Sequence, residues 1–352
     1  MLNKGDEQTQ LVGQGSTAIQ ATGNVVVNNG LSYSEVREVV LDVFRSNFLQ
    51  LAGEAKDVAR QRAEEITDKF LEKLKKENPA GLSQAPSPDF QYGLFSVQRD
   101  FARTADTDLG DLLVDLLVDR TKHPQRDMAQ IVLNECLIVA PKVTNEQLSA
   151  LAIIFFFKYC TSEGILTFHQ LSAQFDRFVR PFIETLPRSL SSYQHLEFAG
   201  CGSAQVTSSR LEDILWTGYQ GLFDKGFEAT ELSGASFYFN PRQQLTSTCL
   251  LDASKIQVRA QNLNHLEKLI TAHRIAPEDA RRLREAFGKN RLNQAEIRAK
   301  CVEVMPYLQA LFDLWESTQL HSMTLTSVGI GLAHANIKRL TGEFAALSVW
   351  IN

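Results

Sequence analysis

The stretch SYSEVREVVLDVFRSNFLQLAGEAKDVARQRAEEITDKFLEKLKKE, residues 32–77, carries the longest helical pattern of the chain. Ser32 and Glu35 have the spacing of a capping box, and Asn78-Pro79 ends the pattern. This spacing predicts one long helix from Tyr33 to Glu77, with a bend at Gly53 as the one expected irregularity. The resulting apolar stripe either packs on its own domain or forms a coiled coil with a second copy. Its members are Val36, Val40, Phe44, Phe48, Leu51, Ala55, Ala59, Ala63, Ile66, Phe70 and Leu74.

Outward from this stretch, the patterns predict a mainly α protein. We expect a β-prone segment in residues 1–30, the long helix in 31–79, a linker at Gly81–Pro88 and a helical body in 89–231. Residues 192–205, which include AGCGSAQ, are expected to form a loop. The helices expected in the body are Asp89–Asp106, Leu109–Arg120, Met128–Val139, Asn145–Tyr159, Thr167–Leu186 and Ser209–Ala229.

Residues 232–352 change in character and predict a small α+β region. Two short β-prone runs, Ser236–Phe239 and Leu245–Leu251, flank Asn240-Pro241 and indicate a hairpin. A strand at Ser322–Leu325, a helix at Thr326–Gly342 and a last apolar run at Ala346–Ile351 follow in the order of a winged-helix ending. Three further helices are expected between these parts, at Ile256–Ala272, Pro277–Phe287 and Gln294–Glu316.

The composition is that of a folded protein without a membrane span. The chain has 352 residues, of which 44% are hydrophobic and 22% charged. Its net charge of −5 argues against broad nucleic-acid binding through phosphates. Five cysteines without a CxxC motif favour reduced thiols and a cytoplasmic location. The most apolar run, Leu148–Phe157, is far shorter than the ~20 residues a spanning helix needs, so membrane contact is expected only after activation.

Three groups of residues carry candidate chemistry, and each has a structural interpretation beside it. Asp111, Asp115 and Asp119 share one helix face, where carboxylates can hold a divalent metal, but a solvated surface gives the same pattern. His195 and Cys201 resemble a base and a nucleophile, although glycine-rich loops also look like this. A basic patch can contact nucleic acid or be an ordinary solvated helix face. It comprises Arg281, Arg282, Arg284, Lys289 and Arg291. We assign no catalytic residue, metal ligand or cofactor.

The segment GQGSTAIQATGNVVVNNG, Gly13–Gly30, has no charged residue and is rich in Gly, Asn, Gln and Thr. Gly23-Asn24 between β-prone flanks is typical of a two-residue hairpin turn. Apolar Ile19, Ala21, Val25 and Val27 can form one dry face, while Gln20, Asn24 and Asn28 can stack in ladders as they do in cross-β assemblies. A hairpin docked on the body, pairing between copies and a disordered tail all remain open.

Residues 19–25, IQATGNV, resemble the RHIM-like motifs of bacterial amyloid signalling, in which short terminal segments join effectors to sensors. The match departs from the motif's apolar-Gln-apolar-Gly core, because Thr22 intervenes before Gly23. The stretches AIQATGNVVVNNGLSYSEVREVV, DFQYGLFSVQRDFARTADTDLGDLLVDLLVDRTK and LTSVGIGLAHANIK also resemble a family of uncharacterised bacterial proteins. These resemblances imply a bacterial cytoplasmic protein with a role in phage defence or a related conflict.

Together these features predict a non-enzymatic, self-assembling effector or sensor of bacterial immunity. The expected partners are copies of the chain and a phage or host protein as trigger, without a strong nucleic-acid signal. The alternatives are a hydrolase, with a site near His195 and Cys201 or on the aspartate face, and a nucleic-acid-binding regulator that uses the tail. The residues expected to mediate oligomerisation are Ile19, Gln20, Ala21, Gly23, Asn24, Val25, Val27, Val36, Val40, Phe44 and Phe48.

Overall fold

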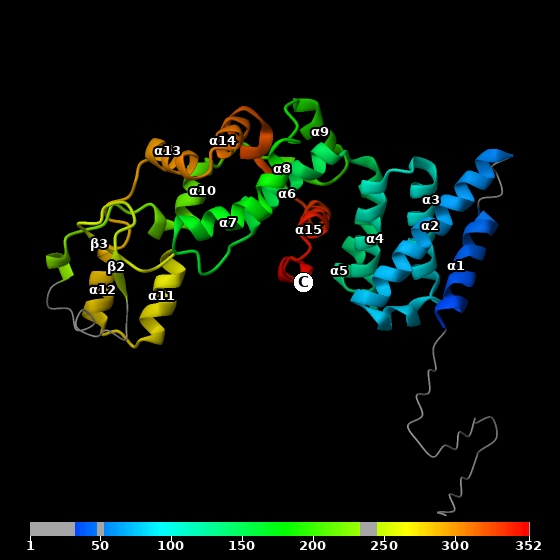
Figure 1. The fold of residues 1–352 in the computed structure, drawn as a ribbon, viewed down its shortest axis with the longest axis horizontal. Helices are drawn as coiled ribbons and strands as arrows, with labels where there is room; N and C mark the ends of the chain where they lie inside the picture. Colours follow the sequence, from blue (N-terminus) through cyan, green and yellow to red (C-terminus); the bar gives the residue numbers. More distant parts are fainter. Residues whose placement is uncertain (1–31, 48–52, 233–244, 352) are drawn as a thin grey trace, which may run out of the picture.

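The computed structural model describes residues 32–47, 53–232 and 245–351. It confirms the expectation of a mainly α protein, in which short strands accompany the helices. Figure 1 shows an elongated molecule with the N-terminal helices at one end and a small α+β unit at the other. The C-terminal helix lies between these two ends. The predicted β-prone hairpin at residues 13–30 lies outside the described residues.

Five helices form the N-terminal end of the molecule. Helices α1 and α2 pack on each other and on α3, while α4 packs against α2, α3 and α5. A 3-10 turn at Pro79–Gln84 connects α2 to α3 where a linker was expected. The bounds are α1 Tyr33–Asn47, α2 Glu54–Glu77, α3 Pro88–Thr104, α4 Thr107–Thr121 and α5 Met128–Val139.

The stretch predicted as one long helix is two helices, α1 and α2. Arg37 Nε in α1 lies 2.6 Å from Asp68 Oδ1 in α2. In a continuous helix these 31 residues would span roughly 45 Å, so the chain folds back between the two helices. Gly53 precedes α2 with a φ of 59°, a left-handed conformation that glycine adopts without strain. The glycine expected to bend the helix therefore stands where the second helix begins.

The middle of the molecule is built around two helices with small or apolar faces. Helix α6 (Asn145–Tyr159) is buried along its apolar run and packs against α15 (Ser327–Thr341). Gly329, Gly331 and Ala333 are small, so α15 can approach its neighbours closely. A Cβ on Gly329 would clash with the backbone of Cys201, and a Cβ on Gly331 would clash with Cys136 Sγ. Short helices α8 (Arg180–Ile183) and α9 (Leu190–Phe198) cover α6.

A two-stranded antiparallel sheet joins the middle of the chain to its tail. Strand β1 (Gly202–Ala204) pairs with β4 (Met323–Leu325), so that Gly202 lies opposite Leu325. The predicted tail strand is therefore present, but the AGCGSAQ stretch contributes a strand where a loop was expected. The sequence did not indicate this strand, because a three-residue strand has too few side chains to show an alternating pattern.

The far end of the molecule carries a second, smaller core. Strands β2 (Thr246–Thr248) and β3 (Ile256–Val258) pair antiparallel beside α11 (Leu263–Ala272) and α12 (Pro277–Ala286). Between this unit and the middle lie α7 (Phe168–Phe178), α10 (Leu211–Gly218), α13 (Gln294–Val304) and α14 (Leu308–Ser317). The small core is formed by Phe227, Leu232, Leu245, Val258, Ala260, Leu266, Ile270, Ala280, Leu283, Ala286 and Phe287.

Several expectations for residues 232–352 differ from the observed structure. The hairpin is β2–β3. Strand β2 lies within the predicted run Leu245–Leu251, whereas β3 occupies the start of the range predicted as the helix Ile256–Ala272, and Ser236–Phe239 lies outside the described residues. The range predicted as one helix at Gln294–Glu316 contains two, α13 and α14. The tail is not a winged helix, because β4 pairs with β1 of the body and Leu347–Val349 forms a 3-10 turn. Helix α15 packs on α4, α5 and α6, so the predicted boundary at residue 232 does not separate the tail from the body.

Candidate functional site

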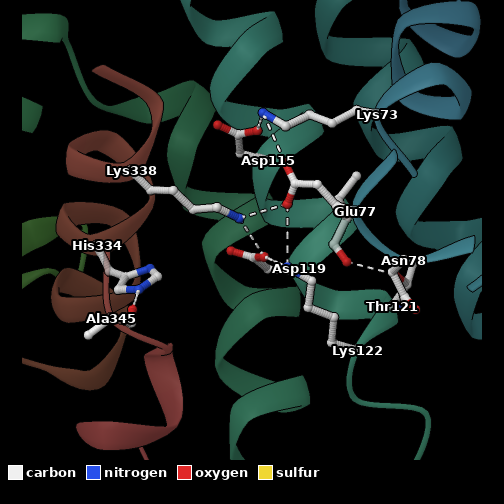
Figure 2. A network of polar contacts seen from close by, with 11 residues as sticks. Lys73, Glu77, Asn78, Asp115, Asp119, Thr121, Lys122, His334, Lys338 and Ala345 are labelled. Carbon is white, nitrogen blue, oxygen red and sulfur yellow. Dashed lines mark hydrogen bonds and ion pairs between the residues drawn. The ribbon is translucent and has the colours of Figure 1, made fainter. Parts of the chain in front are cut away.

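A network of charged side chains joins α2, α4 and α15 (Figure 2). Helix α2 supplies Lys73 and Glu77, and helix α4 supplies Asp115 and Asp119. Each pair is four residues apart, which places both members on one helix face. Lys338 reaches the same two faces from α15.

Lys338 lies at the centre of the network. Its Nζ is 3.0 Å from Glu77 Oε2 and 2.8 Å from Asp119 Oδ1. Lys122 approaches the same oxygens, with its Nζ 2.6 Å from Asp119 Oδ1 and 3.4 Å from Glu77 Oε2. The Lys338 side chain is only 16% exposed. Two lysines from different helices thus share two carboxylates, and the tail helix is tied to the N-terminal end of the molecule.

The aspartate face singled out in the sequence pairs with a row of lysines on α2. Asp115 forms an ion pair with Lys73, and Asp111 forms one with Lys69. Asp115 is fully buried and Asp119 is nearly so, so the interpretation as a solvated face is wrong for these two. The four-residue spacing of Lys69 and Lys73 was a signal for this pairing, but only the fold shows that the two faces meet.

The two buried aspartates differ in their electrostatics. Burial raises the pKa of Asp119, but the attraction of Lys338 and Lys122 outweighs burial and holds this pKa below the usual range. The pKa of Glu77 is lowered by the same two lysines and Lys73 despite its partial burial. For Asp115, burial outweighs Lys73, and the pKa is raised. Ionised Asp119 therefore stabilises the fold, whereas the charge of Asp115 is less favoured in the folded chain than in water.

These shifts predict how folding stability depends on pH. The depressed pKa values of Glu77 and Asp119 add stability above their unfolded values of about 4, and that stability is lost as pH falls through the folded pKa values. We expect Lys338→Met to reduce the loss of thermal stability between pH 7 and pH 3, because both carboxyls return toward ordinary pKa values. Thermal unfolding followed by circular dichroism measures this loss. Lys300→Met, which removes a lysine paired with the exposed Glu303, should leave the wild-type profile unchanged. The assignment is contradicted if Lys338→Met also keeps that profile.

The other predicted catalytic pair does not form. Cys201 is buried, and burial raises the pKa of its thiol to about 12. His195 is exposed on α9, and its Nδ1 lies 3.1 Å from Gln147 Nε2 and 3.3 Å from Gln147 Oε1. Within the described part of the chain, no hydrogen bond joins His195 to Cys201. Cys201 instead lies beneath the start of α15, where its carbonyl accepts from Thr326 N at 3.0 Å.

Each side chain of the predicted basic patch lies close to a carboxylate. Arg284 and Glu267 form a two-pronged pair at 2.6 and 2.8 Å, and Lys289 Nζ lies 2.9 Å from Glu231. The remaining ion pairs are Arg281 with Glu278 and Glu285, Arg282 with Glu278, and Arg291 with Asp213. This pairing reduces the positive charge that a phosphate backbone would meet.

The predicted oligomerisation residues fall into two groups. Val36, Val40 and Phe44 are buried within the chain, the first two in the main core and Phe44 against Ala59, Ala63 and Ala102. This fits the interpretation in which the helix packs on its own domain. Phe48 and the residues in 13–30 lie outside the described residues.

The described residues lack the features of two other kinds of site, a metal centre and a membrane-spanning helix. In residues 32–47, 53–232 and 245–351, no group of three His, Cys, Asp or Glu side chains is arranged to hold a metal ion. No helix in the same ranges combines the length and apolar character that crossing a membrane requires.

One protein-family model, whose description reads only ":-like", matches residues 30–351. The match covers far more than half of the chain, and the chain therefore belongs to this family. The description names no activity. No curated protein and no solved structure matches the chain.

Proposed function

We propose that the protein is a non-enzymatic, self-assembling effector or sensor of bacterial immunity, which assembles through residues 13–30. The observation that carries the proposal is the composition of this segment, which has eighteen residues without a charge and with β-prone apolar runs. The segment stands directly before the capped start of α1, where Ser32 N donates to Glu35 Oε2 at 2.7 Å. The family match begins at residue 30, so the segment precedes the part of the chain that defines the family.

The physical basis of the assembly is in-register stacking of short β-strands. Stacked copies pair every backbone group with the copies above and below, and identical Asn and Gln side chains form ladders. Gln20 and Asn24 would ladder while Ile19, Val25 and Val27 close a dry face. Lysine or glutamate in such a stack would place like charges about 5 Å apart, and the segment has neither.

The burial of Val36, Val40 and Phe44 leaves these three side chains unavailable for a contact between copies of the chain. These side chains were the other candidate contact between copies, and their place in the chain's own core removes that surface in this conformation. Phe48, the remaining candidate from the helix, lies outside the described residues, and we therefore propose residues 13–30 as the contact between copies. Each copy would then contribute its folded body to the assembly. A phage or host protein would be the trigger, and the proposal involves no cofactor.

A peptide of residues 13–30 tests the stacking chemistry in isolation. We expect it to form fibres with the ~4.7 Å cross-β spacing in X-ray diffraction. The same peptide with Val25→Lys and Val27→Lys should remain monomeric, because repeated charges on the dry face repel along the stack. A scrambled peptide of identical composition is the control for simple insolubility. A wild-type peptide that stays monomeric at millimolar concentration would exclude self-stacking of this segment.

A further inference from the structure

A large cleft lies between the end of α6 and the exposed side of α10. Its volume is about 1080 Å³, which is just above the usual range of about 300–1,000 Å³ for small-molecule sites. One part of its lining is apolar and aromatic and includes Phe157, Ile214 and Tyr219. The charged side chains of the lining are Lys158, Arg210 and Asp213. No residue of the aspartate network lines this cleft.

Two of the three charges in the lining are neutralised by neighbouring side chains. The Arg210 guanidinium lies 3.6 Å from carboxylate oxygens of both Glu212 and Glu316. The Asp213 carboxylate lies 3.4 Å from Arg291 and accepts from Gln294 Nε2 at 3.0 Å. Both are therefore balanced before any ligand enters.

Lys158 is different, because no carboxylate of the described residues lies within ion-pair distance of its ammonium. Its Nζ donates to the backbone carbonyls of His321 and Met323, at 2.9 Å each. An ammonium has three N–H donors, so one remains. The ring of Trp315 lies beneath it, with its centroid 5.5 Å from Nζ. Lys158 is thus a fixed positive charge without a counter-ion.

We propose that this cleft binds an organic monoanion with an aromatic or apolar body, whose negative group pairs with Lys158. The apolar lining would bury the body of the ligand, and the remaining N–H of the ammonium would bind the anionic group. A single unbalanced positive charge fits one negative charge, since a second would have no partner. Burial of the ammonium lowers the pKa of Lys158 to about 8. The proposal is independent of self-assembly.

The test is isothermal titration calorimetry on the full chain with a matched pair of probes. Indole-3-acetate is an aromatic monoanion, and indole-3-acetamide is its neutral counterpart of nearly the same shape. We expect one site per chain, with the dissociation constant of the acetate at least tenfold below that of the amide. Equal affinity for the two probes, or binding of neither, overturns the proposal.

Four variants locate the binding. Lys158→Met should remove the preference for the anion, and Lys158→Arg should retain it. Thr217→Trp adds bulk from an exposed position in the cleft lining and should abolish binding of both probes without changing any charge. Lys300→Met removes a lysine outside this cleft and should bind as wild type does. If Lys158→Met does not fold, the Thr217→Trp variant tests the location of the site. Binding of the probes by Thr217→Trp as tightly as by wild type would show that they do not bind in this cleft.

Discussion

Gly329→Leu is expected to prevent folding, and Gly329→Ala is expected to destabilise the protein by about 3 kcal/mol or more. The reason is the approach of α15 to the backbone of Cys201. A Cβ on Gly329 would lie 1.9 Å from the Cys201 carbonyl oxygen and 2.9 Å from its carbonyl carbon. Backbone atoms cannot rotate away as side chains can, so α15 and strand β1 would have to separate.

Thermal unfolding followed by circular dichroism measures this effect. A loss of about 3 kcal/mol corresponds to a fall in Tm of roughly 4 °C or more for a chain of this length. Gly218→Ala is the matched control, because a Cβ there has no heavy atom within 4 Å and the residue ends α10. That variant should unfold within about 1 kcal/mol of wild type. A Gly329→Ala protein as stable as Gly218→Ala would mean that α15 does not pack as described.

Asp119→Asn and Asp115→Asn are expected to change the free energy of unfolding by different amounts, although the two residues lie one helical turn apart. Asp119 is the shared partner of Lys122 and Lys338, and its loss leaves a 16% exposed ammonium with Glu77 alone. Breaking a buried pair from one side is strongly destabilising, and we expect about 2 kcal/mol here. Burial raises the pKa of Asp115, so that its neutral form is more favoured in the folded chain than in water. Asparagine resembles that neutral form, and Asp115→Asn should change stability by less than about 1 kcal/mol.

Urea unfolding at pH 7 compares the two variants under one condition. Each substitution keeps the shape of the side chain and removes one negative charge, so each serves as the control for the other. Equal destabilisation would show that net charge, rather than the position of Lys338, determines the effect. The double variant Asp119→Asn with Lys338→Met should recover part of the loss, because it removes the ammonium left with one partner.

Local sequence signals located the helices well where capping and periodicity agree. Helix α6 begins and ends at the predicted residues, Asn145 and Tyr159, because Thr144 and Gln147 form a capping box before a short apolar run. The glycines of α15 let this helix approach the backbone of Cys201 closely. These features depend on neighbours in the sequence, which a single chain displays directly.

The features that sequence alone did not reveal depend on contacts between distant segments. The apolar pattern of residues 32–77 continues in phase across residues 48–52, so it gave no sign that α1 packs back onto α2. The spacing of Asp115 and Asp119 placed them on one face, but nothing local indicated that Lys338, more than two hundred residues later, meets that face. Lys158 was overlooked because it ends an apolar run and belongs to no motif. A lysine without a counter-ion can be recognised only when its surroundings are known.

We propose that residues 13–30 drive self-assembly. The most direct test of this role is light scattering after size-exclusion chromatography of the full chain and of a 31–352 truncation, each with and without phage infection of the producing cells. We expect the full chain to form a large species after infection and the truncation to remain small under both conditions. If the two proteins elute with the same mass in every condition, assembly through residues 13–30 is wrong.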